Sequence, residues 1–339
     1  MKMTAEERLR RKNEFDGNLS LGVRHFNVST GRDAHLKRRA VEKPNYADPL
    51  TGLLREEFGV ARACPLCGTD DGQLLFVKEA FRHLRCNSCG MVYVSPVLRV
   101  EHLHSFYLGE ESYSQVLCNS TQRLMDWKKF QYGLDLIETY VPDRGKLLDV
   151  GCGPGVFLEA ARERGWEIQG VEFNKWCGGR LRELGIEVID VPLEEANLAA
   201  KSYTCVTLWD VLEHITNCRA FLDVIRRILV PNGMVVLQVP NINSFVSRVL
   251  HEKSATFSGD SHVNLFSAAT LTRLLETAGF QMLECETIWT ELGTINNYLN
   301  FEDPYFGEAG PVLDFLTPQY IHQHLLGSRL LALASAQQA

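Results

Sequence analysis

The chain has 339 residues and a formal net charge of −7 at pH 7, and 45% of its residues are hydrophobic. This length allows about two domains with a sizeable core, and the acidic balance argues against a nucleic-acid footprint over the whole surface, leaving room only for a local patch. No apolar run reaches the roughly 20 residues of a membrane span, and the charged N-terminus lacks an apolar signal region. We therefore expect a cytoplasmic protein without membrane contact, whose ten cysteines are thiols or metal ligands.

The first stretch, residues 1–60, is charged and has no sustained periodicity. Its basic residues cluster at 8–12 and again at 37–39. A solvated helix followed by a linker is the simplest interpretation of this pattern. The alternative is an arm that folds over a substrate or a partner.

Residues 61–98 carry two cysteine pairs between short segments that resemble strands. Each pair has the spacing C-x₂-C, and eighteen residues separate the pairs. This spacing is typical of zinc ribbons, and the glycine after each pair, Gly68 or Gly90, permits a tight knuckle turn. The predicted ligands are Cys64, Cys67, Cys86 and Cys89. Because four thiolates close a tetrahedral site, we expect a structural Zn²⁺ that supplies folding energy to this small module.

Helical and strand patterns alternate through the rest of the chain, residues 99–339. The apolar spacing predicts a long helix over 119–141, capped by Asn119 or Ser120. Strands are predicted at 147–150, 167–172, 186–191, 205–209, 234–239, 280–288 and 328–336, with helices at 155–165, 175–184, 217–230 and 267–278. This alternation predicts an α/β fold with a mostly parallel sheet of seven strands and helices on both faces. Residues 289–326 form an expected insertion before the last strand.

The most specific motif is the segment KLLDVGCGPGVFLEA at 146–160. An apolar strand ends near Asp149, three glycines follow at 151, 153 and 155, and a helix then begins. Glycines at such a turn permit a close approach of the backbone to a ligand, and Glu172 at the tip of the next strand can accept two hydrogen bonds from a ribose diol. Position six of the dinucleotide-binding fingerprint is Val156 instead of glycine. An acid before the loop also suits a cationic ligand better than a pyrophosphate.

With these features the chain resembles the class I S-adenosylmethionine (SAM)-dependent methyltransferases, whose sheet is Rossmann-like. The resemblance covers roughly residues 140–336 and includes LWDVLEHI (208–215), LVPNGMVVLQVPNINS (229–244) and the pattern HVNLFS…LTRLLETAGF (262–280). The last pattern is common in the branch similar to ubiquinone-type O-methyltransferases. The chain departs from many relatives at Thr204, where they carry aspartate, and at Asn232, where they carry glycine. Asparagine tolerates left-handed backbone, so we expect the turn at Asn232 to persist.

The resemblance implies SAM as the methyl donor and gives roles to residues at the strand ends. The glycine loop would lie under the methionine part, the acid of the second strand would hold the ribose, and residues after the third strand would flank the adenine. The side chains after the fourth strand would border the sulfonium and the substrate. The implied SAM-binding residues are Asp149, Gly151, Cys152, Gly153, Gly155, Glu172, Phe173, Asp190, Leu193, Trp209 and Asp210. In similar enzymes an aromatic residue from the segment of Tyr107 and Tyr113 closes over the cofactor, although either tyrosine could simply pack in the core.

Methyl transfer from a sulfonium is an in-line displacement, to which a protein contributes mainly by aligning the nucleophile with the sulfur–methyl bond. An oxygen or nitrogen nucleophile also benefits from a general base, and histidine suits that role near neutral pH. His214, just past the fourth strand, and His262, in a loop after the fifth strand, are the candidate catalytic residues. For His214 the competing interpretation is a histidine satisfied by backbone contacts at a helix start.

A metal interpretation of the same region stays open. Asp210, Glu213 and His214 form a D-x-x-E-H pattern, and acids with an imidazole can hold Mg²⁺ or another divalent ion. Ubiquinone-type relatives carry E-x-x-E-H at this position and are associated with a divalent ion, so Asp210 would replace their first glutamate. The motif is also widespread in relatives without a metal.

Together these features predict a SAM-dependent methyltransferase acting on a small molecule of a biosynthetic pathway, on oxygen in the first instance, with nitrogen and carbon open. The zinc ribbon would pack on the catalytic domain and help to wall the substrate pocket, because few basic residues surround it. One alternative is an RNA or protein methyltransferase that uses the ribbon for recognition. Another is a binding protein with a degenerate site. Homo-oligomerisation stays open, and the aromatic residues of 289–326 could line a pocket or a dimer face.

Overall fold

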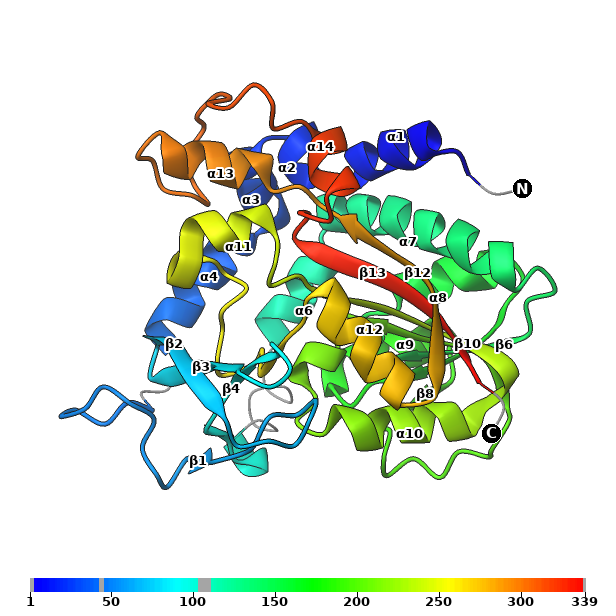
Figure 1. Cartoon of the computed structure of the whole chain (residues 1–339). Helices are drawn as coiled ribbons and strands as arrows, with labels where there is room; N and C mark the ends of the chain where they lie inside the picture. The colour runs from blue at the N-terminus through cyan, green and yellow to red at the C-terminus, as the bar shows by residue number, and fades with distance from the viewer. Residues whose placement is uncertain (1–2, 43–45, 103–110, 338–339) are drawn as a thin grey trace.

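The computed structural model describes residues 3–42, 46–102 and 111–337. Its centre is a seven-stranded sheet with the order β12-β13-β10-β9-β6-β7-β8 (Figure 1). The strands are β6 (Lys146–Val150), β7 (Glu167–Val171), β8 (Val188–Ile189), β9 (Tyr203–Trp209), β10 (Leu229–Pro240), β12 (Phe280–Ile288) and β13 (Arg329–Ala336). Of these strands, only β13 runs antiparallel to its neighbours, β10 and β12. The expected α/β fold with a mostly parallel sheet is therefore confirmed.

Helices cover both faces of the sheet (Figure 1). Those packed on the sheet are α7 (Ser120–Tyr140), α8 (Val156–Glu163), α9 (Lys175–Glu183), α10 (Cys218–Ile228) and α12 (Ala268–Thr277). The others are α6 (Glu111–Cys118), α11 (Phe245–Leu250), α13 (Leu292–Leu299), α14 (Pro318–Gln323) and the short η1 (Leu212–His214) and η2 (His251–Lys253), besides four in the N-terminal arm. Across the described ranges, no helix combines the length and the apolar character that a membrane crossing requires.

Alternation along the strands divides the core into two layers, one on each face of the sheet. Leu148 and Val150 of β6 belong to one hydrophobic cluster, with Phe221 of α10 and Leu271 of α12. Leu147, which alternates with them, belongs to the second cluster, under α7, α8 and α9. Apolar strands of this kind need cover on both sides, because either face left open would expose hydrophobic surface to water.

Most predicted elements are confirmed with small shifts of their ends. Asn119 caps α7, because its side-chain oxygen accepts hydrogen bonds from the amides of Thr121 and Gln122. Asn232 has the left-handed backbone (φ 61°) that the turn before the central part of β10 requires. The third strand is shorter than predicted, since β8 lies at the sheet edge, where β7 alone supplies hydrogen bonds.

A second, antiparallel sheet of four strands contains the module of the cysteine pairs, in the order β11-β4-β3-β2. Its strands are β2 (Gly72–Lys78), β3 (Phe81–Cys86), β4 (Val92–Val94) and β11 (Asn264–Leu265), and a separate two-stranded ladder joins β1 (Gly59–Val60) to β5 (Val97–Leu98). Strand β11 comes from the C-terminal half of the chain and pairs Asn264 with Tyr93 and Leu265 with Val92. The cysteine module and the larger domain thus share one sheet.

The N-terminal arm forms four helices, of which the first packs along α7 (Figure 1). They are α1 (Ala5–Phe15), α2 (Gly17–Ser20), α3 (Val23–Thr30) and α4 (Arg32–Glu42). Lys12 Nζ lies 2.9 Å from Glu286 Oε2, and Arg8 Nη1 lies 2.8 Å from Glu284 Oε2. Helix α1 is therefore not the solvated helix that its charge pattern indicates, because these basic side chains pair with acids on β12.

The segment between β12 and β13 contributes α13 and α14 and packs beside α11 (Figure 1). Leu292 and Ile295 of α13 share a small hydrophobic cluster with Val246 of α11. Two of its aromatic residues behave differently: Phe301 is fully exposed, whereas the Tyr305 hydroxyl accepts a hydrogen bond of 2.8 Å from the amide of Ala255.

We expect Gly133→Ala, in the middle of α7, to lower the free energy of unfolding by about 1–2 kcal/mol. A Cβ at this position would lie 2.8 Å from Cη2 of Trp209, whose ring cannot withdraw because Phe130 and Phe157 pack against it. Gly179→Ala in α9 is the matched control: a Cβ there meets no atom within 4 Å, so the usual helical preference for alanine should raise stability slightly. Urea unfolding of both variants checks this, and equal effects would contradict the packing argument.

Candidate functional site

The carboxyl ends of β6, β7 and β9 lie side by side, because these strands pair in parallel. Asp149, next to last in β6, is 1% exposed and accepts a hydrogen bond of 2.6 Å from the hydroxyl of Thr207 on β9. Burial raises the pKa of Asp149 to about 8, and the nearby carboxylate of Glu172 acts in the same direction. An acid in this position favours a cationic or hydrogen-bond-donating ligand beside it.

The loop after β6 turns through three glycines with left-handed backbone. The φ angles of Gly151, Gly153 and Gly155 are 69°, 51° and 86°. A Cβ on Gly151 would lie 2.7 Å from Val211 Cγ2, and one on Gly155 would lie 2.5 Å from Leu181 Cδ2. At Gly151 and Gly155 a side chain is therefore disfavoured both by the backbone conformation and by the lack of space, whereas at Gly153 only the backbone conformation disfavours it.

Glu172 follows β7 and ties the tip of that strand to the glycine loop. Its Oε2 accepts from the amide of Gly153 at 2.9 Å, and its Oε1 accepts from the amide of Asn174 at 2.8 Å. Burial raises the pKa of this carboxyl, while the amide hydrogen bonds oppose the shift. The amide of Phe173 is a third donor to this carboxylate. Because a carboxylate accepts about four hydrogen bonds, about one position stays open for a ligand hydroxyl.

A pocket of about 550 Å³ opens beside Glu172. Of the predicted SAM-binding residues, Glu172, Phe173 and Asp190 line it. Leu193 is 2% exposed and packs in the hydrophobic core, so its side chain does not line the pocket. Val191 and Pro192 also line the pocket and belong to the segment 190–193 that was expected to flank the adenine. The sequence pattern did not indicate the other lining residues, Asn174, Lys175, Gly178 and Arg182, which come from α9 and its N-terminal cap and carry no recognisable motif.

Two further predicted residues turn their side chains into the core. The sulfur of Cys152 lies 2.6 Å from where a Cβ on Gly170 would stand, so Cys152 contributes only backbone to the loop surface. The ring of Trp209 lies 5.1 Å from that of Phe130 and 5.2 Å from that of Phe157. Among the described residues, the buried Nε1 of Trp209 finds no hydrogen-bond acceptor. A buried donor of this kind is a candidate contact for a ligand.

Asp210 leaves β9 with left-handed backbone (φ 56°) and turns its carboxylate toward β10 and β13. Its Oδ1 accepts from Arg329 Nε at 3.0 Å, and its Oδ2 accepts from the side-chain amide of Gln238. The sequence pattern indicated neither partner, since Arg329 stands 119 residues further along the chain. This pairing draws Asp210 toward β13 and gives Arg329 a charge partner in the interior.

Glu213, His214 and His262 converge at the same end of the sheet. One ligand-type atom from each lies within 4.8 Å of the others, and His214 Nε2 is 3.9 Å from Glu213 Oε1. His214 Nδ1 lies 2.9 Å from the carbonyl oxygen of Ser261, and His262 Nδ1 lies 2.9 Å from that of Thr256. A carbonyl oxygen only accepts, so both Nδ1 atoms carry protons and both Nε2 atoms present a lone pair.

Burial shifts the titration of this cluster toward the uncharged forms. It raises the pKa of Glu213 well above its ordinary value, lowers the pKa of His214, and lowers the pKa of His262 to about 3. Glu213 is fully buried, and within the described residues neither of its carboxyl oxygens has a hydrogen-bond partner. The D-x-x-E-H pattern had suggested Asp210 as the third candidate metal ligand beside Glu213 and His214. In the structure His262 takes that place. A buried carboxyl beside two imidazole lone pairs can accept a proton donor or a cation.

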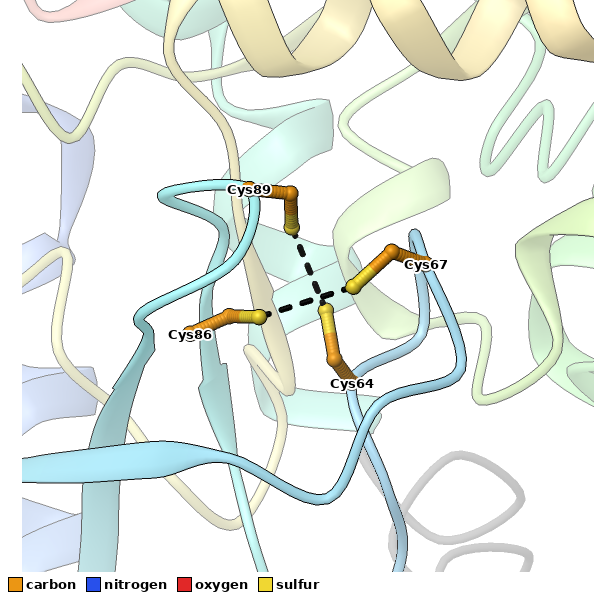
Figure 2. Close-up of side chains that lie close together, drawn as sticks. All are labelled: Cys64, Cys67, Cys86 and Cys89. Atoms are coloured by element: carbon orange, nitrogen blue, oxygen red, sulfur yellow. Dashed lines mark hydrogen bonds between the residues drawn. The ribbon is translucent and has the colours of Figure 1, made fainter.

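The four cysteines of the N-terminal module converge on one point (Figure 2). The sulfur atoms of Cys64 and Cys89 lie 3.5 Å apart, as do those of Cys67 and Cys86, and all four lie within 4.8 Å of one another. Thiolates about 2.3 Å from a tetrahedral zinc stand about 3.8 Å apart. The observed spacing and the all-sulfur donor set therefore fit Zn²⁺. The glycines after the two pairs adopt the expected left-handed turns.

Of the two tyrosines that precede the long helix, the structure describes only Tyr113. Tyr107 lies outside the described residues. Tyr113 of α6 contacts the arm, with its ring 5.3 Å from that of His35 on α4. This contact brings the N-terminal arm to the segment that was expected to cover the cofactor.

Comparison with known proteins agrees with this geometry. Residues 122–285 match the family model of a methyltransferase domain. The ubiquinone biosynthesis O-methyltransferase of Photobacterium profundum is 31% identical over 106 residues, which make up 29% of this chain and 45% of that protein. The chain thus spans less than half the length of this relative. The match to the methyltransferase family model begins within α7, ends in β12 and covers just under half of the chain.

Two solved structures are also among the matches. A SAM-dependent methyltransferase from Archaeoglobus fulgidus is 21% identical with a TM-score of 0.47, covering 66% of this chain and 98% of that one. The 1,6-didemethyltoxoflavin-N1-methyltransferase of Burkholderia thailandensis, with bound 1,6-didemethyltoxoflavin and S-adenosylhomocysteine, is 14% identical with a TM-score of 0.47. It covers 79% of this chain and 100% of its own.

Replacing Asp149 with asparagine should remove a pH-dependent loss of stability. The folded chain holds this proton up to a pKa of about 8, while the unfolded chain releases it near the ordinary value of 3.8. The stability of the wild type therefore falls as the pH rises through that window, by at most about 1.4 kcal/mol per pH unit. Asp149→Asn keeps the acceptor for Thr207 and should lack this fall.

Urea unfolding across the same pH window checks the prediction. Asp143→Asn, on an exposed turn, is the control and should follow the wild type. If the curves of Asp149→Asn and the wild type run parallel throughout the window, the raised pKa of Asp149 is wrong.

Proposed function

We propose that the protein transfers a methyl group from SAM to a small molecule, in the first instance to an oxygen atom, with nitrogen and carbon as the other acceptors. The observation that carries this proposal is the arrangement of Asp149, the bare glycine loop and Glu172 at one edge of a methyltransferase domain. An acid before the loop and an acid at the tip of the next strand suit a ligand with an ammonium group at one end and a ribose diol further along.

The side chains of this edge fit SAM in their chemistry. Beside its three amide hydrogen bonds, Glu172 keeps about one acceptor position for a ribose hydroxyl. Phe173 and Asp190 line the adjoining pocket, where an adenine would find an apolar face and a hydrogen-bond acceptor. Asp149 and the carbonyl oxygens of the glycine loop are left for the methionine part, since the amides of Gly151 and Gly153 already donate to Val171 and Glu172. An ammonium beside Asp149 would favour its charged form.

In the proposed reaction the S–CH₃ bond breaks with its electron pair left on sulfur, and a bond forms between the methyl group and the acceptor oxygen. The oxygen loses its proton. His214 and His262 can receive that proton or its hydrogen bond, because both present Nε2 lone pairs fixed by their Nδ1–H contacts to Ser261 and Thr256. Both imidazoles are neutral at pH 7, since burial lowers the pKa of each.

A divalent ion is the second kind of group that could bind to the acceptor atoms of Glu213, His214 and His262. Glu213, His214 and His262 supply one oxygen and two nitrogen donors, and each histidine has the backbone hydrogen bond on Nδ1 that orients metal-bound imidazoles. Nitrogen-rich donor sets suit zinc, copper, iron or nickel better than Mg²⁺, which prefers oxygen ligands. The donor set therefore does not fit the Mg²⁺ that the D-x-x-E-H pattern suggested. A bound ion would help to acidify an acceptor hydroxyl.

Zn²⁺ held by Cys64, Cys67, Cys86 and Cys89 is the second resident group that we propose. The sulfur spacing fits it, and four thiolates leave no open position for a reacting molecule. Its role is therefore structural.

The basic residues around the ribbon favour a small substrate over RNA. Arg62 donates to main-chain carbonyls of Val94, Thr216 and Val263, and Lys78 donates to that of Ser254. These two charges are engaged inside the protein, so the basic patch on the surface is reduced chiefly to the exposed Arg82 and Arg85. RNA binding depends on accessible basic groups that neutralise phosphates.

We expect Glu172→Gln to weaken SAM binding by about 10- to 100-fold, because a neutral amide loses the charge-assisted hydrogen bonds to the ribose. Isothermal titration of the purified chain with SAM measures this. Glu276→Gln, on the exposed side of α12, is the control and should bind SAM like the wild type. An unchanged affinity of Glu172→Gln would overturn the cofactor assignment.

The substrate class is tested with methyl-labelled SAM and an extract of the source cells. After incubation, small molecules, nucleic acid and protein are separated and counted. We expect the label in the small-molecule fraction and none with Glu172→Gln. Label in RNA or in protein would instead support macromolecular recognition through the ribbon.

A further inference from the structure

The loop that carries His262 leans on the cysteine module. In residues 254–263, the ring of Phe257 lies 4.8 Å from that of Phe76 and 5.6 Å from that of His83, both in the module. Gly259 packs so closely that a Cβ there would lie 2.3 Å from the Cβ of Phe81. At the start of the loop, Lys78 Nζ donates to the carbonyl of Ser254 at 2.9 Å.

Val263, the residue after His262, joins the module to the cluster by main-chain hydrogen bonds. Its carbonyl accepts from the amide of Val94 on β4 at 3.0 Å, and its own amide donates to the carbonyl of Glu213 at 2.9 Å. One residue therefore contacts the module on one side and the Glu213–His214 segment on the other. The position of His262 relative to Glu213 depends on both bonds.

Arg62, two residues before the first zinc-ligand cysteine, holds the same three segments together. Its Nε donates to the carbonyl of Val94 at 2.9 Å, and its Nη1 donates to that of Thr216, two residues past His214, at 3.1 Å. Its Nη2 donates to the carbonyl of Val263 and to the side chain of Asn264. A planar guanidinium with five donors can link three backbone segments in one fixed geometry, which a lysine cannot do.

The contacts of Arg62 are hydrogen bonds that hold backbone segments in place, and they are not ion pairs. Within the described ranges no carboxylate forms an ion pair with it, and burial lowers the pKa of its guanidinium to about 10. Burying a cation without an acid partner is costly, so the compensation comes from carbonyl oxygens of the module and of the two histidine-bearing segments. Simple packing of a ribbon on a domain would not require this arrangement.

We infer that Arg62 and the zinc-folded module position His262 against Glu213 and His214. Arg62 is a positioning residue: it acts through the backbone on either side of the cluster and contacts none of the three side chains. The module then has a role beyond walling the pocket, because the third member of the cluster stands in a loop that the module supports. The inference rests on the proposed role of the cluster and is independent of the SAM site at β6 and β7.

The test measures how well the three side chains are spaced, using Co²⁺ as the probe and the zinc-loaded chain. Arg62→Met keeps the length of the side chain and removes its donors. We expect it to weaken Co²⁺ binding by about 10- to 100-fold, the usual effect of losing a group that orients metal ligands. The SAM dissociation constant and the bound zinc, measured on the same samples, should stay at their wild-type values.

The control is Arg99→Met, in the same part of the chain. Its guanidinium donates only to the carbonyl of Glu57 among the described residues and does not reach the cluster, so Co²⁺ binding should be unchanged. Arg62→Lys, which can restore one donor but not three, should recover Co²⁺ binding in part. His262→Asn should abolish it and thereby locate the probe.

Several results would overturn the inference. One is Co²⁺ binding that Arg62→Met leaves unchanged, and another is a zinc-loaded wild type that binds no Co²⁺ at all. If Arg62→Met does not fold, Lys78→Met takes its place and should give a smaller, several-fold loss through the Ser254 contact; no loss would again contradict the role of the module. Failure of the wild type to bind SAM would instead contradict the proposed function, so the two failures are distinguishable.

Discussion

The parallel pairing of β6 with β7 and with β9 is the constraint on which the rest of the site depends. Because these three strands run in one direction, their carboxyl ends meet at one edge, and Asp149, Glu172 and Asp210 come together from segments that are far apart in the chain. The glycine loop can turn there only because Gly151 and Gly155 leave space for Val211 and Leu181. The positions of the glycine loop and of the three acids at this edge therefore follow from the parallel pairing of the strands.

Burial at this edge gives the site its electrostatic character. Carboxyl groups with few charge partners have raised pKa values, as at Asp149 and Glu213, and the imidazole of His262 has a lowered one. All three shifts favour the neutral side chains, so a cation or a hydrogen-bond donor beside them would be stabilising. Asp210 has a charge partner of its own, because Arg329 reaches it from the antiparallel strand.

The cysteine module belongs to the same unit through β11. Its sheet is completed by a strand from the C-terminal half, and the loop before that strand contains His262. A small module has little core of its own, so the sulfur cluster and the shared sheet stabilise it together. The N-terminal arm is integrated similarly, since Arg8 and Lys12 pair with acids of β12. Segments that the sequence separates thus support a common site.

The sequence by itself determined the order along the chain of the seven sheet strands and the helices that cover them, the glycine loop with its two acids, a cap at Asn119 or Ser120, the left-handed turn at Asn232 and the four cysteines. Each of these depends on local backbone preference or on short fixed spacing, which a sequence displays directly. Only the tertiary structure decided that His262 lies beside Glu213 and His214, and that Arg329 forms an ion pair with Asp210. It also decided that the side chains of Leu193 and Cys152 turn into the core. Finally, it decided that Arg62 links the module to both histidine-bearing segments. These contacts join residues tens to more than a hundred positions apart. Their partners are chosen by how the packed layers bring side chains together, and no local pattern records that choice.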